Sequence, residues 1–453
     1  MVRALTASDT ARLAWYLGVP AVLGGVVAPN PRFTPSLVRR QAVAATFAFF
    51  ERIRREYGPR AWMWLPPART LLVLDPDGIA EILDSDANFA DPPAKAVFLS
   101  RVTPRGVIVS RGDAWRVRRM LNDDALAFGQ ALLPASDEFL EIAKVEIERL
   151  LGNRPDVLAW RDFSELAGRV AQQVIFGRGR FDPALAARAA RVASSSNWAR
   201  RRPSDLGFIF QHFQAALARP SLEQEPGAAL APRCRRWLEE HESARQMADA
   251  HSQMAFWLFV IRDALELHVS RTLALIASAP EALRDGIRAE VRHDRPVTAD
   301  SIEGAVLLEG CVKEELRLWT AVPVLLRRAM RDCMLGDTPI RAGQQMLLHV
   351  GFYHRDPQVF GAAANRFDPE SRSRDDRSNE QSATNSTPPL YVFSRGRQAC
   401  AGQFVAMFLL KATLACLLRR VDVTLHGTKL RLDQVPTAID PFHLRFAVRT
   451  LDG

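Results

Sequence analysis

A loop that carries one cysteine and leads directly into an apolar helix constrains this chain more than any other feature. Residues 393–402 read FSRGRQACAG, and the stretch 403–418 then has apolar side chains at helical spacing. Cys400 is therefore predicted to lie just before a helix N-terminus. The free backbone N–H groups and the helix dipole at that position favour a thiolate.

The residues around Cys400 suit a single metal ligand better than a disulfide. Gly396 and Gly402 allow a positive φ or a close backbone approach on either side of the sulfur. Phe393 and Phe404 supply apolar walls. The alternative is a buried structural cysteine, because free cysteine is often found in protein cores.

The pattern Phe-x-x-Gly-x-x-x-Cys-x-Gly resembles the heme-ligand loop of the cytochrome P-450 superfamily. A cysteine thiolate binds the heme iron in that family. The resemblance implies heme b (iron protoporphyrin IX) with Cys400 as its axial ligand. It also implies cofactor contacts from residues of the same loop, namely Phe393, Arg395, Gly396, Gln398 and Gly402. Gln398 departs from the family, which usually has Arg or His there to contact a propionate; Arg395 or Arg397 could substitute.

Trp115 and Arg119 lie four residues apart, so they share one face of a predicted helix. An indole N–H and a guanidinium on one face can bind a carboxylate. A surface cation–π contact explains the pair equally well. By resemblance, Trp115, Arg119 and the more distant Arg327 are the residues that contact the heme propionates.

Glu314 and Arg317 are one helical turn apart and could form an ion pair. They precede the Cys400 loop by about 80 residues, as in the family. The resemblance assigns Glu314 and Arg317 a structural pairing that also involves Arg366, in the segment Asn-Arg-Phe-Asp-Pro at 365–369.

The longest apolar helix is predicted over residues 254–278, ahead of the Ala-Pro-Glu landmark at 279–281. By resemblance this is the helix that passes over the heme, and the family's acid–threonine pair falls at Asp263 and Ala264. The acid is present and the threonine is absent. Val260 and Ile261 stand where the family usually has small residues.

The missing hydroxyl matters because it normally helps to organise proton delivery. Asp263, Glu266, ordered water or the substrate must then do so; otherwise the enzyme uses peroxide or rearranges a substrate without oxygen. We take Asp263, Ala264 and Glu266 as the candidate catalytic positions. The alternative is that Arg262, Asp263 and Glu266 form a salt-bridged polar face.

The predicted fold is mainly α-helical with a small β-rich lobe, and the resemblance places the heme between the long helix and the Cys400-loop helix. We expect a lead-in arm over residues 1–40 and one heme-thiolate domain over 41–453. Near the arm, the patterns predict a helix over 36–57, strands at 62–65 and 70–74, a short helix over 79–83 and irregular structure over 89–112.

The net charge of +9 could attract nucleic acid, anionic lipid or an acidic protein. No zinc-finger or RNA-binding signature appears, so we expect an acidic electron donor and no nucleic-acid partner. No flavin- or nicotinamide-binding glycine motif is visible, which favours a separate donor of ferredoxin or flavodoxin type with its reductase. The sequence as a whole resembles a bacterial, soluble member of the family.

The apolar run over residues 13–28 is shorter than the roughly 20 residues a membrane-spanning helix needs, so membrane contact is expected to be peripheral at most. The five cysteines are odd in number and lack CxxC pairing, which favours a reducing compartment, and we expect a cytoplasmic protein.

Three functions stay open at this point. The first is a monooxygenase that inserts one atom of dioxygen into an apolar small molecule, in secondary or specialised metabolism. The second is a heme-thiolate enzyme for peroxide-driven oxidation, isomerisation or dehydration, which Ala264 favours. The third is a heme-binding scaffold or sensor without turnover. The sequence does not identify the substrate.

Overall fold

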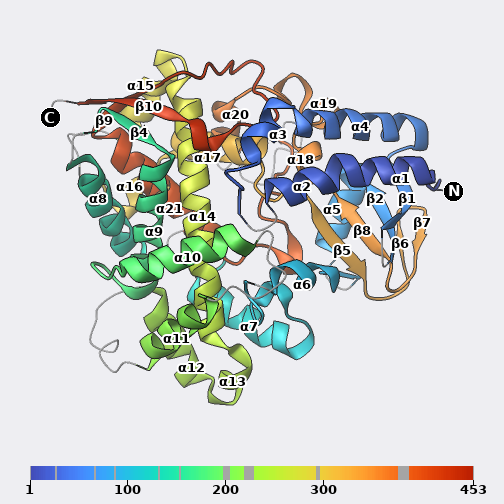
Figure 1. Ribbon diagram of the computed structural model, residues 1–453, viewed down its shortest axis with the longest axis horizontal. Coiled ribbons are helices and arrows are strands. Elements are labelled where there is room, and N and C mark those ends of the chain that lie inside the picture. The colour runs from blue at the N-terminus through green and yellow to red at the C-terminus, as the bar shows by residue number, and fades with distance from the viewer. Residues whose placement is uncertain are drawn as a thin grey trace.

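The computed structural model describes residues 2–25, 28–65, 68–85, 88–100, 102–130, 133–152, 155–196, 205–218, 229–291, 296–375 and 387–451. One long helix, α14 (Ala250–Ala277), runs through the helical body of the molecule (Figure 1). The structure confirms the predicted long helix and extends it by four residues at its start. Because most of its side chains are buried on every side, α14 forms the centre of the main hydrophobic core.

Three helices that the site depends on pack against α14: α9 (Trp160–Phe176), α17 (Val306–Leu318) and α21 (Gln403–Leu418). Helix α21 covers the residues predicted to follow the cysteine loop. The remaining helices of the main body are α7 (Gly112–Ala125), α8 (Ser136–Gly152), α10 (Pro183–Ser196), α11 (Leu206–Leu217), α12 (Leu230–Glu240), α13 (Arg245–Ala248), α15 (Glu281–Glu290), α16 (Ala299–Glu303), α18 (Val350–Tyr353), α19 (Pro357–Phe360) and α20 (Pro369–Asp375).

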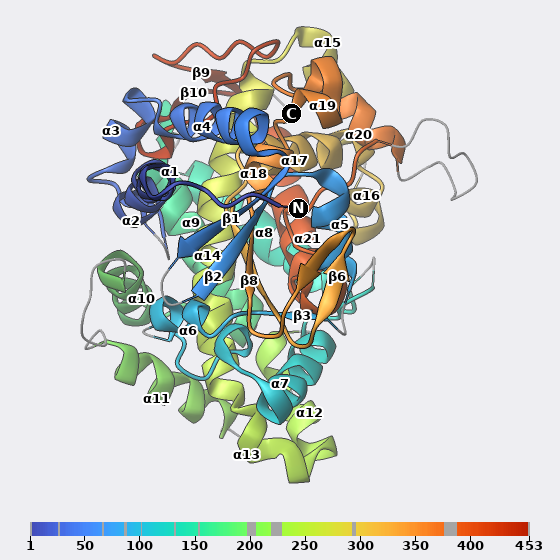
Figure 2. The same cartoon turned by 90° about the vertical axis from the view of Figure 1, so that its right-hand side faces the viewer.

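A five-stranded sheet lies beside the helical body, on the side where the chain begins (Figures 1 and 2). Its strand order is β1-β2-β8-β5-β3, and β2 pairs in parallel with β8 while the other neighbours are antiparallel. The strands are β1 (Arg60–Leu65), β2 (Ala68–Val73), β3 (Phe89–Ala90), β5 (Leu325–Ala329) and β8 (Gln345–Leu348). Two smaller sheets consist of β4 (Val157–Ala159), β10 (Arg445–Thr450) and β9 (Val421–Leu425), and of β6 (Cys333–Leu335) and β7 (Thr338–Ile340).

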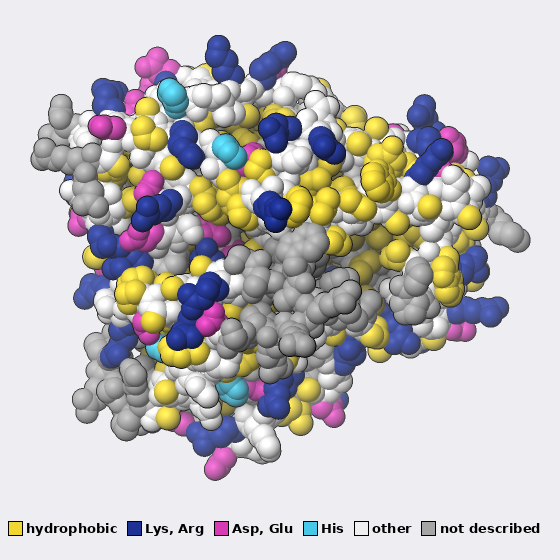
Figure 3. Space-filling view, in the orientation of Figure 1, with side chains coloured by type: hydrophobic (Ala, Val, Ile, Leu, Met, Phe, Trp, Pro, Cys, Tyr) yellow, Lys and Arg dark blue, Asp and Glu magenta, His cyan; other side chains and the backbone are white. Residues whose placement is uncertain are grey.

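The N-terminal segment folds into a series of helices, and the first and the last of them contact strand β1 (Figure 1). They are α1 (Ala7–Leu13), a π-helical turn (Ala14–Gly18), α2 (Val19–Gly24), α3 (Thr34–Arg39) and α4 (Ala42–Tyr57). The prediction of one helix over 36–57 was wrong, because Gln41 takes a left-handed φ of 52° and separates α3 from α4. Figure 3 shows hydrophobic side chains gathered over this part of the surface, where Trp15 and Val22 are exposed.

Residues 89–112 are more regular than predicted. They contain β3, α6 (Ala94–Leu99) and a 3-10 turn (Val107–Val109). Long-range partners order this stretch, because the side chain of Gln253 on α14 accepts from the Val107 N–H and donates to the Arg105 carbonyl. Helix α5 (Pro76–Asp84) begins three residues earlier than predicted, at the Asp75 cap. Among the described residues, we find no helix with the length and apolar character needed to cross a bilayer.

Candidate functional site: the Cys400 loop and the long helix

The cysteine loop ends on the N-terminus of α21, as the sequence predicted. The Cys400 N–H donates to the Phe393 carbonyl at 2.8 Å, which closes the loop on itself. Cys400 keeps accessible surface although protein atoms surround its thiol closely enough to desolvate it. The thiol therefore opens into a recess rather than onto the open surface.

Burial raises the pKa of the Cys400 thiol, whereas the backbone N–H of Gly402 and the charge of Arg119 lower it. Desolvation is the largest of these effects. The N–H groups at the helix N-terminus favour the thiolate as predicted, because the Gly402 N–H lowers the pKa, but desolvation of the thiol outweighs this effect. A bound cation would supply the missing stabilisation, because a coordinating thiol loses its proton to the metal.

Only one of the two flanking glycines is required by the backbone. Gly396 has a φ of 65°, in the left-handed region that favours glycine. Gly402 has a φ of −91°, and a Cβ there would meet nothing closer than Leu126 at 3.8 Å. Neither a positive φ nor a close approach of other protein atoms therefore requires a glycine at position 402. Ser394 is a further left-handed residue, with a φ of 58°.

Helix α7 brings Arg119 to the loop, where its Nη1 donates to the Ala399 carbonyl. Its guanidinium also lies 4.9 Å from the ring centre of Phe128, and its Nε donates to Asp123 at 2.8 Å. Trp115 shares the helix but meets a different partner, since the Arg397 guanidinium lies 4.4 Å from the centre of its ring. The structure therefore places both predicted α7 residues against the loop.

Arg327 reaches the loop from strand β5. Its Nη2 donates to the Ser394 hydroxyl at 2.6 Å, and its Nη1 donates to Asp91 at 3.0 Å. The side chain is almost fully buried. Its predicted contact with a heme propionate stays a prediction. Ser394 and Asp91 were missed, and no spacing signal in the sequence connects either of them with Arg327.

The two remaining polar loop residues differ in their surroundings. Arg395 pairs with Asp84 on α5 at 3.0 Å, so it is directed away from Trp115 and Arg119. The structure thus gives Arg397, rather than Arg395, the position next to Trp115. The Oε1 atom of Gln398 is buried and has no hydrogen-bond partner among the described residues.

On α14, Arg262 and Glu266 form an ion pair at 2.8 Å that faces α9, where Arg262 also donates to the Ser164 hydroxyl at 3.0 Å. The polar-face alternative is therefore correct for these two residues, and Asp263 joins it through a longer ion pair with Arg262. Asp263 is 3.5 Å from Arg262, and its Oδ1 has no hydrogen-bond partner among the described residues. Burial, and then the neighbouring Glu266, raise the pKa of Asp263 to about 7; burial raises that of Glu266 too.

One stripe of α14 keeps accessible surface although most of the helix is buried. Phe256, Val260, Asp263 and Ala264 recur at the spacing of one helix face, and the Val260 side chain is 41% exposed. Ile261 is on the buried side, at 9% exposure. Asp263 and Ala264 thus share an accessible face, whereas Glu266 lies toward α9.

Helix α17 carries the predicted Glu314–Arg317 pair, fully buried and joined by two hydrogen bonds of 2.6 and 2.7 Å. The expected participation of the Arg366 side chain is contradicted. That side chain is exposed and pairs with Asp368, and only its carbonyl accepts from Arg317. The buried Arg372 on α20 takes its place and donates to Glu314 at 3.2 Å.

The residues around Cys400 fit a heme. A thiol in a recess supplies a soft ligand for iron, and Arg119, Arg327 and the Trp115–Arg397 pair supply donors for anionic side groups. The buried, unpartnered Oε1 of Gln398 belongs to the same loop. Arg327 already holds the carboxylate of Asp91, so any propionate would share that guanidinium or displace Asp91.

The comparisons with known proteins agree with this geometry. The Cytochrome P450 family model matches residues 28–214 and 269–439. Cytochrome P450 CYP72A616 from Paris polyphylla is 23% identical over 430 residues, which cover 85% of this chain and 80% of that protein. Xanthotoxin 5-hydroxylase CYP82C2 from Arabidopsis thaliana is 36% identical over 141 residues, 31% of this chain and 27% of that protein.

Among solved structures, the cytochrome P450 CYP102L1 superposes with a TM-score of 0.69 at 16% identity, covering 90% of this chain and 98% of that one. That likeness shows a shared fold. Family membership in turn implies a heme with an axial cysteine thiolate. The family model, the fold and the cysteine loop lead to one conclusion: the chain belongs to the cytochrome P450 family.

Proposed function

We propose that this protein is a heme-thiolate monooxygenase that inserts one atom of dioxygen into an apolar small molecule. The observation that carries the proposal is the Cys400 recess at the start of α21, bordered by Arg119 and Arg327, in a chain of this family. The bound heme would supply the oxygen chemistry, and Cys400 would be its axial ligand.

The chain's own residues have separate tasks in this proposal. Arg119, Arg327 and the Trp115–Arg397 pair hold and orient the cofactor through its carboxylates. Asp263 exchanges a proton at its carboxyl group, because the residue lies on the accessible face of α14 and the pKa of this group is close to neutral. Glu266 is held by Arg262, which makes it a poorer relay.

The electron donor we propose is a separate acidic protein of ferredoxin or flavodoxin type. The Cys400 loop carries the exposed residue Arg395, and the chain has a net charge of +9. Reduction by an acidic donor should slow markedly as the salt concentration rises. A rate that is independent of salt would contradict this choice of donor.

The second candidate is a heme-thiolate enzyme driven by peroxide, or one that rearranges its substrate. Ala264 favours it, because no hydroxyl stands beside Asp263 on the accessible face of α14. Turnover that requires both dioxygen and an electron donor supports the monooxygenase. Turnover with peroxide alone, or with neither, supports the second candidate.

The first test is the absorption difference spectrum of the reduced protein with carbon monoxide. A strongly red-shifted Soret band is expected, and Cys400→Ser should abolish it. The matched control is Cys416→Ser, since Cys416 is buried toward the far end of the same helix and should leave the band unchanged. An unchanged band in the Cys400 variant would show that another residue is the ligand.

A further inference from the structure

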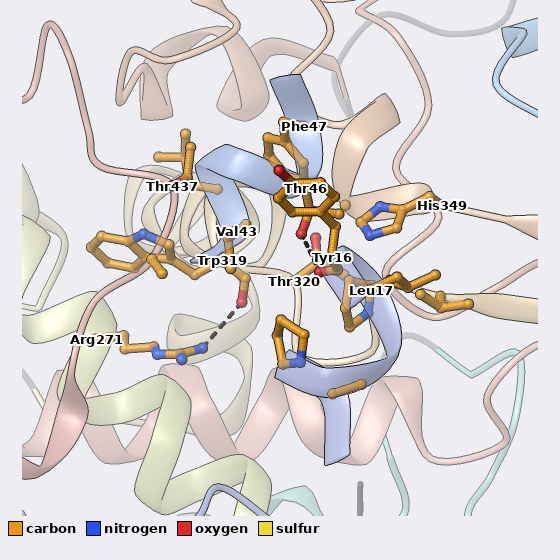
Figure 4. Close-up of a pocket in the computed structure, with 17 residues that line it drawn as sticks. Tyr16, Leu17, Val43, Thr46, Phe47, Arg271, Trp319, Thr320, His349 and Thr437 are labelled. Carbon is orange, nitrogen blue, oxygen red and sulfur yellow. Dashed lines mark hydrogen bonds between the residues drawn. The ribbon is translucent and has the colours of Figure 1, made fainter. Parts of the chain in front are cut away.

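A second cavity, of about 230 Å³, lies between the N-terminal helices and the C-terminal half of α14 (Figure 4). None of the cysteine-loop residues lines it. Its walls are mainly apolar. They come from the π-helical turn, α2, α4, the segment after α17, the start of α18 with the neutral His349, and residues 437–438. They include Tyr16, Leu17, Val43, Phe47, Trp319 and Val324. A cavity of roughly 150 Å³ holds a benzene molecule, so this one has room for a ring or short chain with a polar head.

One cation, Arg271 of α14, lines this apolar space. Its Nη1 donates to the Trp319 carbonyl at 3.1 Å, as the dashed line in Figure 4 shows. Its Nε is buried and has no hydrogen-bond partner in the described part of the chain. A buried donor without an acceptor is uncommon in folded proteins and calls for an explanation.

The carboxylate nearest to Arg271 does not satisfy it. Glu315 Oε1 forms a long ion pair with Nη1, at 3.9 Å and beyond hydrogen-bond distance, and has no hydrogen-bond partner in the described residues. The other oxygen, Oε2, is bonded to His268 Nδ1 at 2.7 Å. Glu315 therefore has a closer partner in His268, and Arg271 keeps donor capacity for an anion.

We propose that this cavity binds an apolar carboxylic acid, with its carboxylate on Arg271 and its hydrocarbon part among Tyr16, Val43 and Phe47. A guanidinium matches a carboxylate with two parallel hydrogen bonds, and Nε is one of the two donors of such a pair. Arg271 follows Ala264 by seven residues, so the cavity lies about 10 Å further along α14. The proposal stands apart from the proposed oxygenase function, because binding needs no turnover.

The test is calorimetric titration of the purified full-length protein with octanoate and with octanol. Octanoate should bind and should lose at least about tenfold in affinity in Arg271→Gln, because a charge-assisted pair is removed. Arg271→Lys, which keeps the charge, should retain part of the affinity. Octanol should bind more weakly than octanoate and should not distinguish these variants.

A second variant keeps the proposal testable if Arg271→Gln fails to fold. Val43→Phe fills the apolar part of the cavity and leaves Arg271 in place, so it should abolish octanoate binding. The control for removal of a cation is Arg284→Gln on α15, outside the cavity. The proposal would be overturned if octanoate did not bind the parent protein. It would also be overturned if octanoate bound Arg271→Gln or Val43→Phe as tightly as the parent. Both outcomes are independent of the carbon monoxide spectrum.

Discussion

At the scale of single residues, the balance between desolvation and nearby hydrogen-bond donors or charges sets the pKa of each buried group. One N–H from Gly402 and the charge of Arg119 do not outweigh the burial of the Cys400 thiol, so its pKa stays above its usual value. A catalytic thiolate is activated by its surroundings. The Cys400 thiolate is instead stabilised only when a metal ion binds it, which is the behaviour expected of a metal ligand.

Asp263 shows the same balance in a carboxyl group. Its neighbour Arg262 is directed to Glu266 and Ser164, so the charge that could stabilise the Asp263 carboxylate is shared. The folded protein therefore holds the Asp263 proton more tightly than the unfolded chain does. Its pKa rises from 3.8 to about 7 on folding.

Replacing Asp263 with Asn should change how stability depends on pH. Between about pH 4 and 7 the folded state keeps a proton that the unfolded chain has lost, so the free energy of unfolding falls as pH rises through this window. Asp263→Asn should remove this contribution and stabilise the protein at pH 8 by up to a few kcal/mol. Urea unfolding from pH 5 to 8 measures it.

The control is Asp137→Asn, at the start of α8 and far along the chain from α14. This variant measures the general effect of replacing a helical carboxyl with an amide. If Asp263→Asn has the same pH slope as the parent protein, the Asp263 carboxyl does not titrate in this range, and its proposed role as a proton relay loses its support.

At the scale of elements, α17 and α20 form a junction that fixes the helical body. Gly310 of α17 lies so close to α20 that a Cβ would meet the Pro369 carbonyl oxygen at 2.3 Å. This approach brings Arg372 to Glu314. Arg317 donates meanwhile to the carbonyls of 354, 363, 364 and 366, so one guanidinium ties the segment after β8 to α17.

The junction predicts that Arg372 and Arg366 differ in importance for stability. Arg372→Gln leaves a buried carboxylate with one partner fewer and should cost about 3 kcal/mol, at the lower end for a buried pair because Arg317 remains. Arg366→Gln alters an exposed side chain and should change the free energy of unfolding by less than about 0.5 kcal/mol. Denaturant unfolding of both variants measures the two effects; equal losses would contradict the assignment.

At the scale of the whole molecule, His349 joins the N-terminal helices to the sheet. Its ring lies 5.7 and 4.9 Å from the ring centres of Phe47 and Phe50 on α4. Its Nδ1 accepts from the Phe352 N–H at 2.9 Å and so caps α18. Burial at this contact lowers the pKa of His349 from 6.5 to about 4, so the ring is neutral in the folded protein.

This contact makes the association of the two layers sensitive to acid. Between about pH 6.5 and 4 the unfolded chain binds a proton that folded His349 does not, so stability falls as pH falls, by about 3 kcal/mol over the window. His349→Asn, which can still cap α18, should flatten this slope. The matched control is the exposed His443→Asn, and a flattening of equal size there would refute the assignment.

The sequence by itself determined the features that depend on short-range spacing. The start of α21 after Cys400, the length of α14 and the Glu314–Arg317 pair each follow from contacts within a turn or two of one helix. The ordered motifs, through their resemblance to the family, also predicted the fold.

Only the tertiary structure decided which of several similar side chains occupies each long-range contact. Arg372 replaced Arg366 beside Glu314, and Arg397 rather than Arg395 reached Trp115. Arginines a few residues apart have the same chemistry, so their sequence spacing does not reveal which one the packing of distant elements will bury. The raised pKa of Cys400 and the cavity at Arg271 are undetermined by sequence for the same reason, because desolvation comes from atoms contributed by many separate segments.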